Sequence, residues 1–198
     1  MELDWDVVDA FLQKQIKHKP AFTTGVSEIN ELLKSHSIDK VFVNLDQRRM
    51  QDQFNEWLSI ASKKNIPKHI KSIYFGLFSM VDPDNEDNGI TTIHFCGSPV
   101  TPQDDDDWAC EVPKSFFPGE RYLVLDDFII LDENTKALDV DPDVEVLVFN
   151  GLLNLLVLNS VTTVLKKILA NHKEVYLGTG FDAGDTYVLG RLTEKGIL

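Results

Sequence analysis

The run VEVLVFNGLLNLLVL, residues 144–158, constrains the possible folds of this chain more than any other segment. Its only polar interruptions are one glutamate and two asparagines, so a helix built from it would be apolar on almost every side. A helix that is hydrophobic all round has to be buried by other elements. We therefore predict one buried helix over residues 143–172, with a possible break at residues 150–151 or 159–160. The run is too short and too polar to span a membrane, which takes about 20 apolar residues.

The part of the chain before this run is predicted to be mainly helical. Apolar residues recur at helical spacing in two long segments, and Asp46 stands directly before the second as a helix cap. Ser27 is the expected cap of a shorter helix. A β-branched run between the second and third helices is typical of a strand. Helices are thus predicted over residues 3–18, 27–36 and 47–65, and a strand over residues 40–45.

The middle and the last part of the chain are richer in strand patterns. An Asn-Gly pair at residues 88–89 ends an acidic loop and predicts the turn between two strands. Residues 126–139 fit either a helix or an irregular strand. Residues 173–192 contain an Asp-Ala-Gly turn between two strand-like runs, which predicts a hairpin. Strands are predicted over residues 71–80, 89–98 and 121–125, and the hairpin over residues 173–192.

Together these elements predict an α+β fold: a mainly antiparallel sheet with helices packed against it. No linker divides the 198 residues, so a single domain over residues 1–198 is expected. Its portions would be a helical part at about 1–66, a strand-rich part at about 70–130, and the long helix with the hairpin at about 143–192.

The net charge of −13 is concentrated in the middle of the chain. Between Asp82 and Glu145 there are 18 acidic residues and only three basic ones. Such a field repels nucleic acid and anionic membranes and attracts cationic partners. We therefore expect no direct nucleic-acid binding and no membrane binding. The first residues lack a basic segment followed by an apolar run, and two cysteines are too few for a disulfide framework, so a cytoplasmic location is expected.

The segment DDDDWACE is the strongest candidate for a binding surface. Four adjacent carboxylates repel one another and persist most easily in water, and the adjacent tryptophan supplies an aromatic anchor. Further acidic residues follow on both sides of the next strand. The predicted partner-binding residues are Asp104, Asp105, Asp106, Asp107, Trp108, Glu111, Asp126 and Asp127.

Metal binding and catalysis are the alternatives. His94, Cys96 and Cys110 lie in one region but lack the spacing of a four-ligand zinc site. The loop at residues 82–89 alternates oxygen ligands as calcium loops do, yet Ile93 stands where a bidentate glutamate is required. No catalytic motif is present, so we predict no enzyme, no metal and no cofactor. A metal-dependent enzyme or a calcium-binding protein that uses the acidic loops remains the alternative.

Three segments, DDDDWACE, FFPGERYL and GFDAGDTYVLG, resemble parts of the immunity proteins of bacterial polymorphic toxin systems. The resemblance covers roughly Phe95–Leu125 and Val175–Leu189. Immunity proteins neutralise secreted or contact-dependent growth-inhibition toxins, many of which are basic nucleases. The resemblance implies a cytoplasmic, non-enzymatic inhibitor that binds a cognate toxin domain through its acidic surface. Since the class has no single fold or motif, the resemblance assigns no residue roles.

Overall fold

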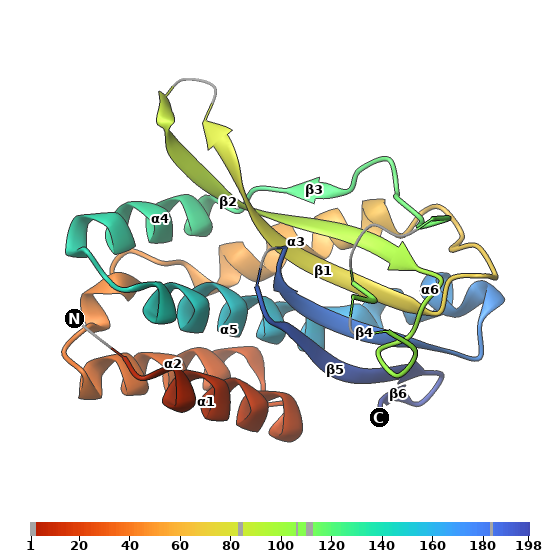
Figure 1. Ribbon diagram of the computed structural model, residues 1–198, viewed down its shortest axis with the longest axis horizontal. Coiled ribbons are helices and arrows are strands. Elements are labelled where there is room, and N and C mark those ends of the chain that lie inside the picture. Colours follow the sequence, from red (N-terminus) through yellow and green to blue (C-terminus); the bar gives the residue numbers. More distant parts are fainter. Residues whose placement is uncertain (1–2, 83–84, 106, 110–112, 183) are drawn as a thin grey trace.

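The computed structural model describes residues 3–82, 85–105, 107–109, 113–182 and 184–198. A six-stranded sheet, ordered β3-β2-β1-β4-β5-β6, is packed against helices on one face (Figure 1). Strand β1 pairs with β4 in parallel, and the other neighbouring pairs are antiparallel. The predicted α+β class with a mainly antiparallel sheet is confirmed. The strands are β1 (Ser72–Asp82), β2 (Asn85–Ser98), β3 (Tyr122–Leu123), β4 (Glu174–Phe181), β5 (Thr186–Thr193) and β6 (Gly196–Ile197).

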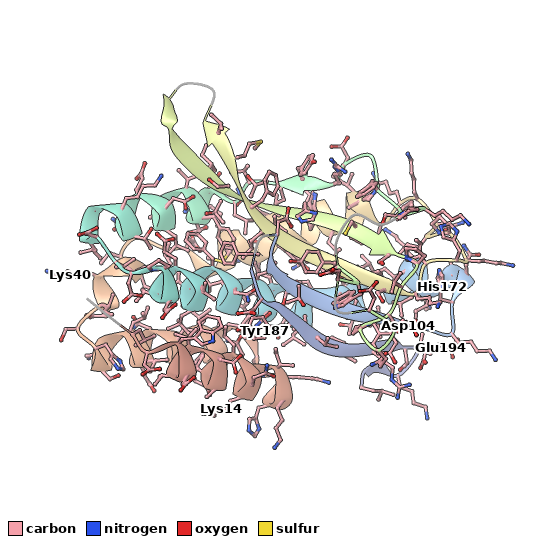
Figure 2. All side chains as sticks on the ribbon, viewed as in Figure 1. Lys14, Lys40, Asp104, His172, Tyr187 and Glu194 are labelled. Carbon is pink, nitrogen blue, oxygen red and sulfur yellow. The ribbon has the colours of Figure 1, made fainter. Side chains whose placement is uncertain are left out.

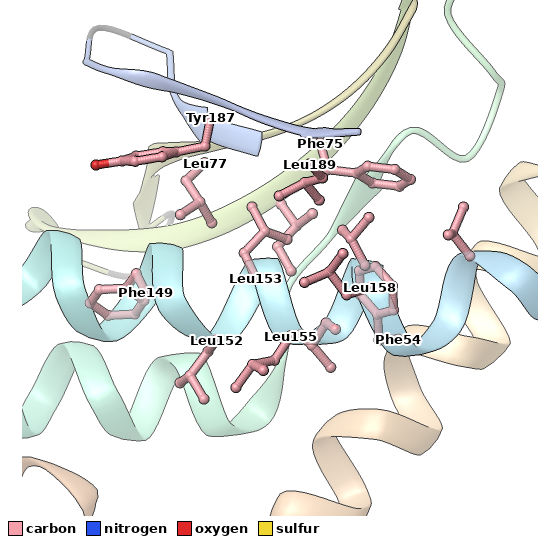
Figure 3. Close-up of a cluster of buried hydrophobic side chains, with 14 of the residues drawn as sticks. Phe54, Phe75, Leu77, Phe149, Leu152, Leu153, Leu155, Leu158, Tyr187 and Leu189 are labelled. Carbon is pink, nitrogen blue, oxygen red and sulfur yellow. The ribbon is translucent and has the colours of Figure 1, made fainter. Parts of the chain in front are cut away.

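The long apolar run forms α5 (Pro142–Ser160), the central helix of the core. Asp141 caps it by accepting a hydrogen bond from the Val144 backbone N–H at 3.1 Å. One side of α5 contacts the other helices, and the opposite side contacts β1 and β4. Figure 3 shows leucines of α5 packed beneath the apolar side chains of the sheet. Asn154, one of the polar interruptions, is buried and accepts a hydrogen bond from Thr179 of β4, which ties the helix to the sheet.

The predicted break at residues 159–160 is correct, and the helix runs without interruption through residues 150–151. Short turns of helix follow it: η2 (Val161–Val164), α6 (Leu165–Ile168) and η3 (Leu169–Asn171). The helical segment Pro142–Val164 has 23 residues and is, by length and hydropathy alone, able to cross a membrane, contrary to our expectation. However, 83% of the most apolar 18-residue stretch of this segment is buried inside the protein, as in the core helix of a globular domain.

Helices α1 (Trp5–His18), α2 (Phe22–Ser35) and α3 (Gln47–Ala61) flank α5. Asp46 caps α3 as predicted, whereas α2 begins five residues before Ser27 and α3 ends four residues early. The strand predicted at residues 40–45 is wrong, because this segment contains η1 (Asp39–Phe42) instead. The Asn134 side chain donates hydrogen bonds to the carbonyls of Val41 and Val43, at 2.9 and 3.1 Å. These carbonyls therefore do not need the N–H groups of a neighbouring strand.

The ambiguous segment at residues 126–139 is α4 (Asp126–Leu138), which packs beside β2. Its Asp132 accepts two hydrogen bonds of 2.7 Å from Thr91, one from the backbone N–H and one from the hydroxyl. The Asn-Gly turn predicted at residues 88–89 is wrong: these residues lie within β2, and Gly89 pairs with Val81. Residues 83–84, between β1 and β2 in the sequence, lie outside the described residues. Strands β1 and β2 extend beyond the rest of the sheet as a two-stranded ribbon (Figure 1).

Candidate functional site

A pocket of about 640 Å³ opens on the face of the sheet that is turned away from α5. Alternation along β1 directs Phe75 and Leu77 toward the helices and Tyr74 and Phe78 toward this outer face. The segment between β2 and β3 crosses the outer face and contributes one wall. The turn between β4 and β5 contributes another. The lining is therefore drawn from four separate stretches of the chain.

Gly76 leaves room for the His94 side chain on the outer face of the sheet. Gly76 of β1 lies between His94 of β2 and Gly180 of β4 in the strand register. A Cβ atom at Gly76 would lie only 2.0 Å from the Nε2 atom of His94. The imidazole therefore lies across β1 in the space that a side chain would occupy. From there its Nε2 atom reaches the Oδ1 atom of Asp182 at 2.6 Å.

The His94–Asp182 pair is a short hydrogen bond within the pocket. The His94 side chain is 14% exposed and that of Asp182 is 49% exposed, so the pair joins the floor of the pocket to its rim. Because an ionised carboxylate can only accept, Nε2 carries the proton in this bond. The rings of Tyr74 and Phe78 meet the imidazole edge-on, at centroid distances of 5.7 and 5.8 Å, and fix its orientation.

Trp108 belongs to a small buried cluster with Tyr74, Cys96 and Ala109, apart from the main core. Its side chain is 2% exposed and meets Tyr74 in an edge-to-face contact, with the centroids 5.9 Å apart. A Cβ atom on Gly178 would lie 2.3 Å from the Cη2 atom of the indole, so this ring packs directly on the backbone of β4. Trp108 was predicted to bind a partner, and in this structure its side chain is buried against Tyr74 and the backbone of β4 instead. A tryptophan gains most from burying its large apolar surface, and the glycines provide the space.

Carboxylates dominate the rim of the pocket. Asp107 comes from the acidic segment, whereas Asp182 and Asp185 come from the turn between β4 and β5. All three are exposed, and within the described residues none forms an ion pair with a lysine or an arginine. Asp104 differs, because it forms an ion pair with Lys71 at 3.4 Å. A hydrogen bond from Thr101, together with Lys71, lowers the pKa of Asp104 and keeps it ionised.

The one arginine of the lining already packs on aromatic rings. The guanidinium carbon of Arg121 lies 4.7 Å from the ring centroid of Phe117 and 4.6 Å from that of Tyr122. Both distances suit cation–π contacts. Among the described residues the lining contains one arginine and three aspartates, so this part of the site carries a net negative charge when His94 is neutral.

The structure brings together only part of the predicted binding set. Asp104 and Asp105 are exposed beside the pocket segment, and Asp107 lines the pocket itself (Asp104 is labelled in Figure 2). Asp106 and Glu111, like Cys110, lie outside the described residues. Asp126 is exposed on α4, where it accepts a hydrogen bond from Gln53 at 2.9 Å, and it does not line the pocket.

Asp127 is a second correction. Its side chain is fully buried and is held by Arg49 of α3, so it cannot meet a partner. Asp126 and Asp127 were both predicted to bind a partner, but α4 turns only the first toward water. Burying the second is tolerable because an arginine and a backbone N–H neutralise and bind it.

Sequence reasoning missed the pairing of His94 with Asp182. His94 was considered only as a zinc ligand beside Cys96 and Cys110, and Asp182 belongs to the Asp-Ala-Gly turn of the predicted hairpin. Within the described part of the chain, no three His, Cys, Asp or Glu side chains gather as a metal site. The Asp-rich segment at residues 82–88 has no described side chains, so the calcium hypothesis there stays untested. Comparisons with protein-family models, curated proteins and solved structures gave no match to this chain.

Proposed function

We propose that this chain is an immunity protein, a non-enzymatic inhibitor that binds a basic bacterial toxin domain in the cytoplasm. The observation that carries the proposal is the convergence of Asp107, Asp182 and Asp185 on one pocket, from two segments far apart in the sequence. Among the described residues these three carboxylates have no lysine or arginine partner, and gathering like charges in this way raises the energy of the free protein. A cationic partner would relieve this repulsion on binding, which favours a protein built to receive one.

The resemblance to immunity proteins supports the same proposal. The resembling segments supply both sides of the pocket: the acidic segment on one side and the turn between β4 and β5 on the other. An inhibitor of a basic nuclease can present carboxylates where the phosphates of the substrate would lie. Electrostatic steering would then raise the association rate, and salt would reduce it.

Coexpression with the product of the neighbouring reading frame, followed by copurification and a toxin-neutralisation assay, tests the proposal. If a basic toxin copurifies, its association rate is measured against ionic strength for the wild type and for a fourfold variant, Asp104, Asp105, Asp106 and Asp107 each changed to Asn. The variant should associate more slowly, with the largest loss at low salt. A matched control removes four exposed charges elsewhere: Glu31→Gln, Asp52→Asn, Glu133→Gln and Glu194→Gln. Equal slowing in the two variants would contradict local recognition by the acidic segment.

A second candidate is an enzyme, and the His94–Asp182 hydrogen bond favours it. A carboxylate that orients an imidazole is the arrangement of a general base. The substitution His94→Gln separates the two candidates. It should abolish turnover if the pocket is catalytic, whereas neutralisation of a toxin should require only the shape and charge of the pocket.

A further inference from the structure

We infer that the pocket on the outer face receives an arginine side chain carried on a loop of the partner protein. This inference deepens the proposed function and rests on it in one respect, namely that the partner is a basic protein. The volume of about 640 Å³ is that of a small-ligand site, so it can hold one arginine together with adjoining loop residues. An acidic surface alone would attract any cation, but this site is concave and lined by aromatic rings.

The aromatic side chains select for a flat cation. Tyr74, Phe78, Tyr122 and Phe181 all line the pocket. Tyr122 already has one guanidinium stacked over it, that of Arg121, which shows that the local geometry suits this group. Guanidinium is planar and weakly hydrated, whereas a lysine ammonium is compact and strongly hydrated. Desolvation in an aromatic pocket therefore costs arginine less than lysine.

The carboxylates provide acceptors for the fork of the guanidinium. His94 occupies the Oδ1 atom of Asp182 and thereby holds the carboxylate in place, which leaves Oδ2 at the rim. Asp185 is three residues further along the chain, and Asp107 lines the same pocket from the acidic segment. An arginine has five N–H donors and can bind two carboxylates at once. An anionic ligand is disfavoured, because it would meet three carboxylates and a single arginine.

The test uses the full-length protein and two short peptides, acetyl-Gly-Arg-Gly-amide and acetyl-Gly-citrulline-Gly-amide. Citrulline has nearly the shape of arginine but carries no charge. Binding is followed by NMR through the ring resonances of His94 and Tyr122. We expect the arginine peptide to shift both resonances and to bind at least about tenfold more tightly than the citrulline peptide, as a charge-assisted pair requires.

Two variants locate the site. The substitution Asp182→Asn should weaken the arginine peptide about tenfold. The control Asp52→Asn removes an exposed carboxylate from α3 and should leave binding unchanged. Absence of binding, equal binding of both peptides, or equal weakening by the two substitutions would overturn the inference. A lysine peptide that binds as tightly as the arginine peptide would overturn the choice of a guanidinium.

The inference and the proposed function fail separately. If a basic toxin associates through the acidic segment while the arginine peptide leaves the pocket resonances unmoved, only the inference is lost. If the peptide enters the pocket but no basic toxin is neutralised, the arginine site stands and the proposed function is wrong.

Discussion

Arg49 of α3 holds the carboxylate of Asp127 at the start of α4 through two hydrogen bonds. The Nε atom lies 3.0 Å from Oδ2, and the Nη2 atom lies 2.9 Å from Oδ1. The backbone N–H of Asp46 donates a third hydrogen bond to Oδ1 at 2.7 Å. This one carboxylate therefore fastens the beginning of α3 to the beginning of α4, and it raises the pKa of the Arg49 guanidinium through hydrogen bonding.

Replacing Asp127 with Asn should lower the free energy of unfolding by about 2–3 kcal/mol, less than the loss of a fully buried ion pair, because Arg49 keeps contact with water. The arginine side chain is 38% exposed. Chemical denaturation of the two proteins measures the difference. The neighbouring substitution Asp126→Asn is the control, because that carboxylate is exposed and should matter by less than about 0.5 kcal/mol. Equal effects of the two substitutions would show that the Arg49–Asp127 pair has no special role.

Replacing Gly76 with Ala should break the His94–Asp182 hydrogen bond. The new Cβ atom would lie 2.0 Å from Nε2 of His94 and 2.5 Å from Cε1 of Tyr74, so the imidazole has to move. The free energy of unfolding should change by less than about 1 kcal/mol, because alanine suits a strand better than glycine does. NMR of the His94 ring nitrogens reports the loss of the bond. Gly119→Ala is the control, since the nearest atom to its Cβ is 3.9 Å away. An unchanged His94 spectrum in Gly76→Ala would refute the steric account.

Stability should fall as the pH rises through the pKa of Asp132. Burial raises this pKa above its ordinary value of 3.8, so the folded chain binds the proton more tightly than the unfolded chain does. Stability from this group is therefore full below about pH 3.8 and declines as the pH passes the raised value. In Asp132→Asn this decline should be absent, so urea unfolding from about pH 4 to 7 should give a flatter curve. Glu133→Gln, an exposed neighbour on α4, serves as the control. Parallel curves for Asp132→Asn and the wild type would contradict the prediction.

Trp108→Ala should destabilise the protein by about 3 kcal/mol. This is the lower end of the usual cost for removing a buried tryptophan, because its cluster is small and lies apart from the main core. Hydrogen exchange should accelerate most in the described residues between β2 and β3, because Trp108 no longer packs on Gly178 of β4. A loss below about 1 kcal/mol would mean that other contacts hold this segment on the sheet.

The fold could be predicted where the pattern is local. The 3.6-residue periodicity located α1 and α3, and the all-apolar run located α5. The strand prediction for residues 40–45 failed because β-branched residues also fill a short turn of helix, and the hydrogen-bond donor to its carbonyls is Asn134, about 90 residues away. Local patterns contain no information about such a distant partner.

The pocket could be predicted only in part, for the same reason. The acidic segment was correctly placed on the surface at Asp104, Asp105 and Asp107. The meeting of His94 with Asp182 depends on the parallel pairing of β1 with β4, which no short motif encodes. A usable signal was the glycine at position 76 within an otherwise apolar strand, because such a glycine often marks a close approach.

The parallel pairing of β1 with β4 also determines when the pocket can exist during synthesis. His94 and Asp182 are 88 residues apart, so their bond closes a long loop. Contacts of such high sequence separation form late, because the entropy of the loop has to be lost before the contact is gained. At about 5–20 residues per second, the ribosome needs roughly 4–18 s to add the turn between β4 and β5 after His94. A nascent chain can therefore display the acidic segment well before it possesses the cavity, and its affinity for a partner should appear in two stages.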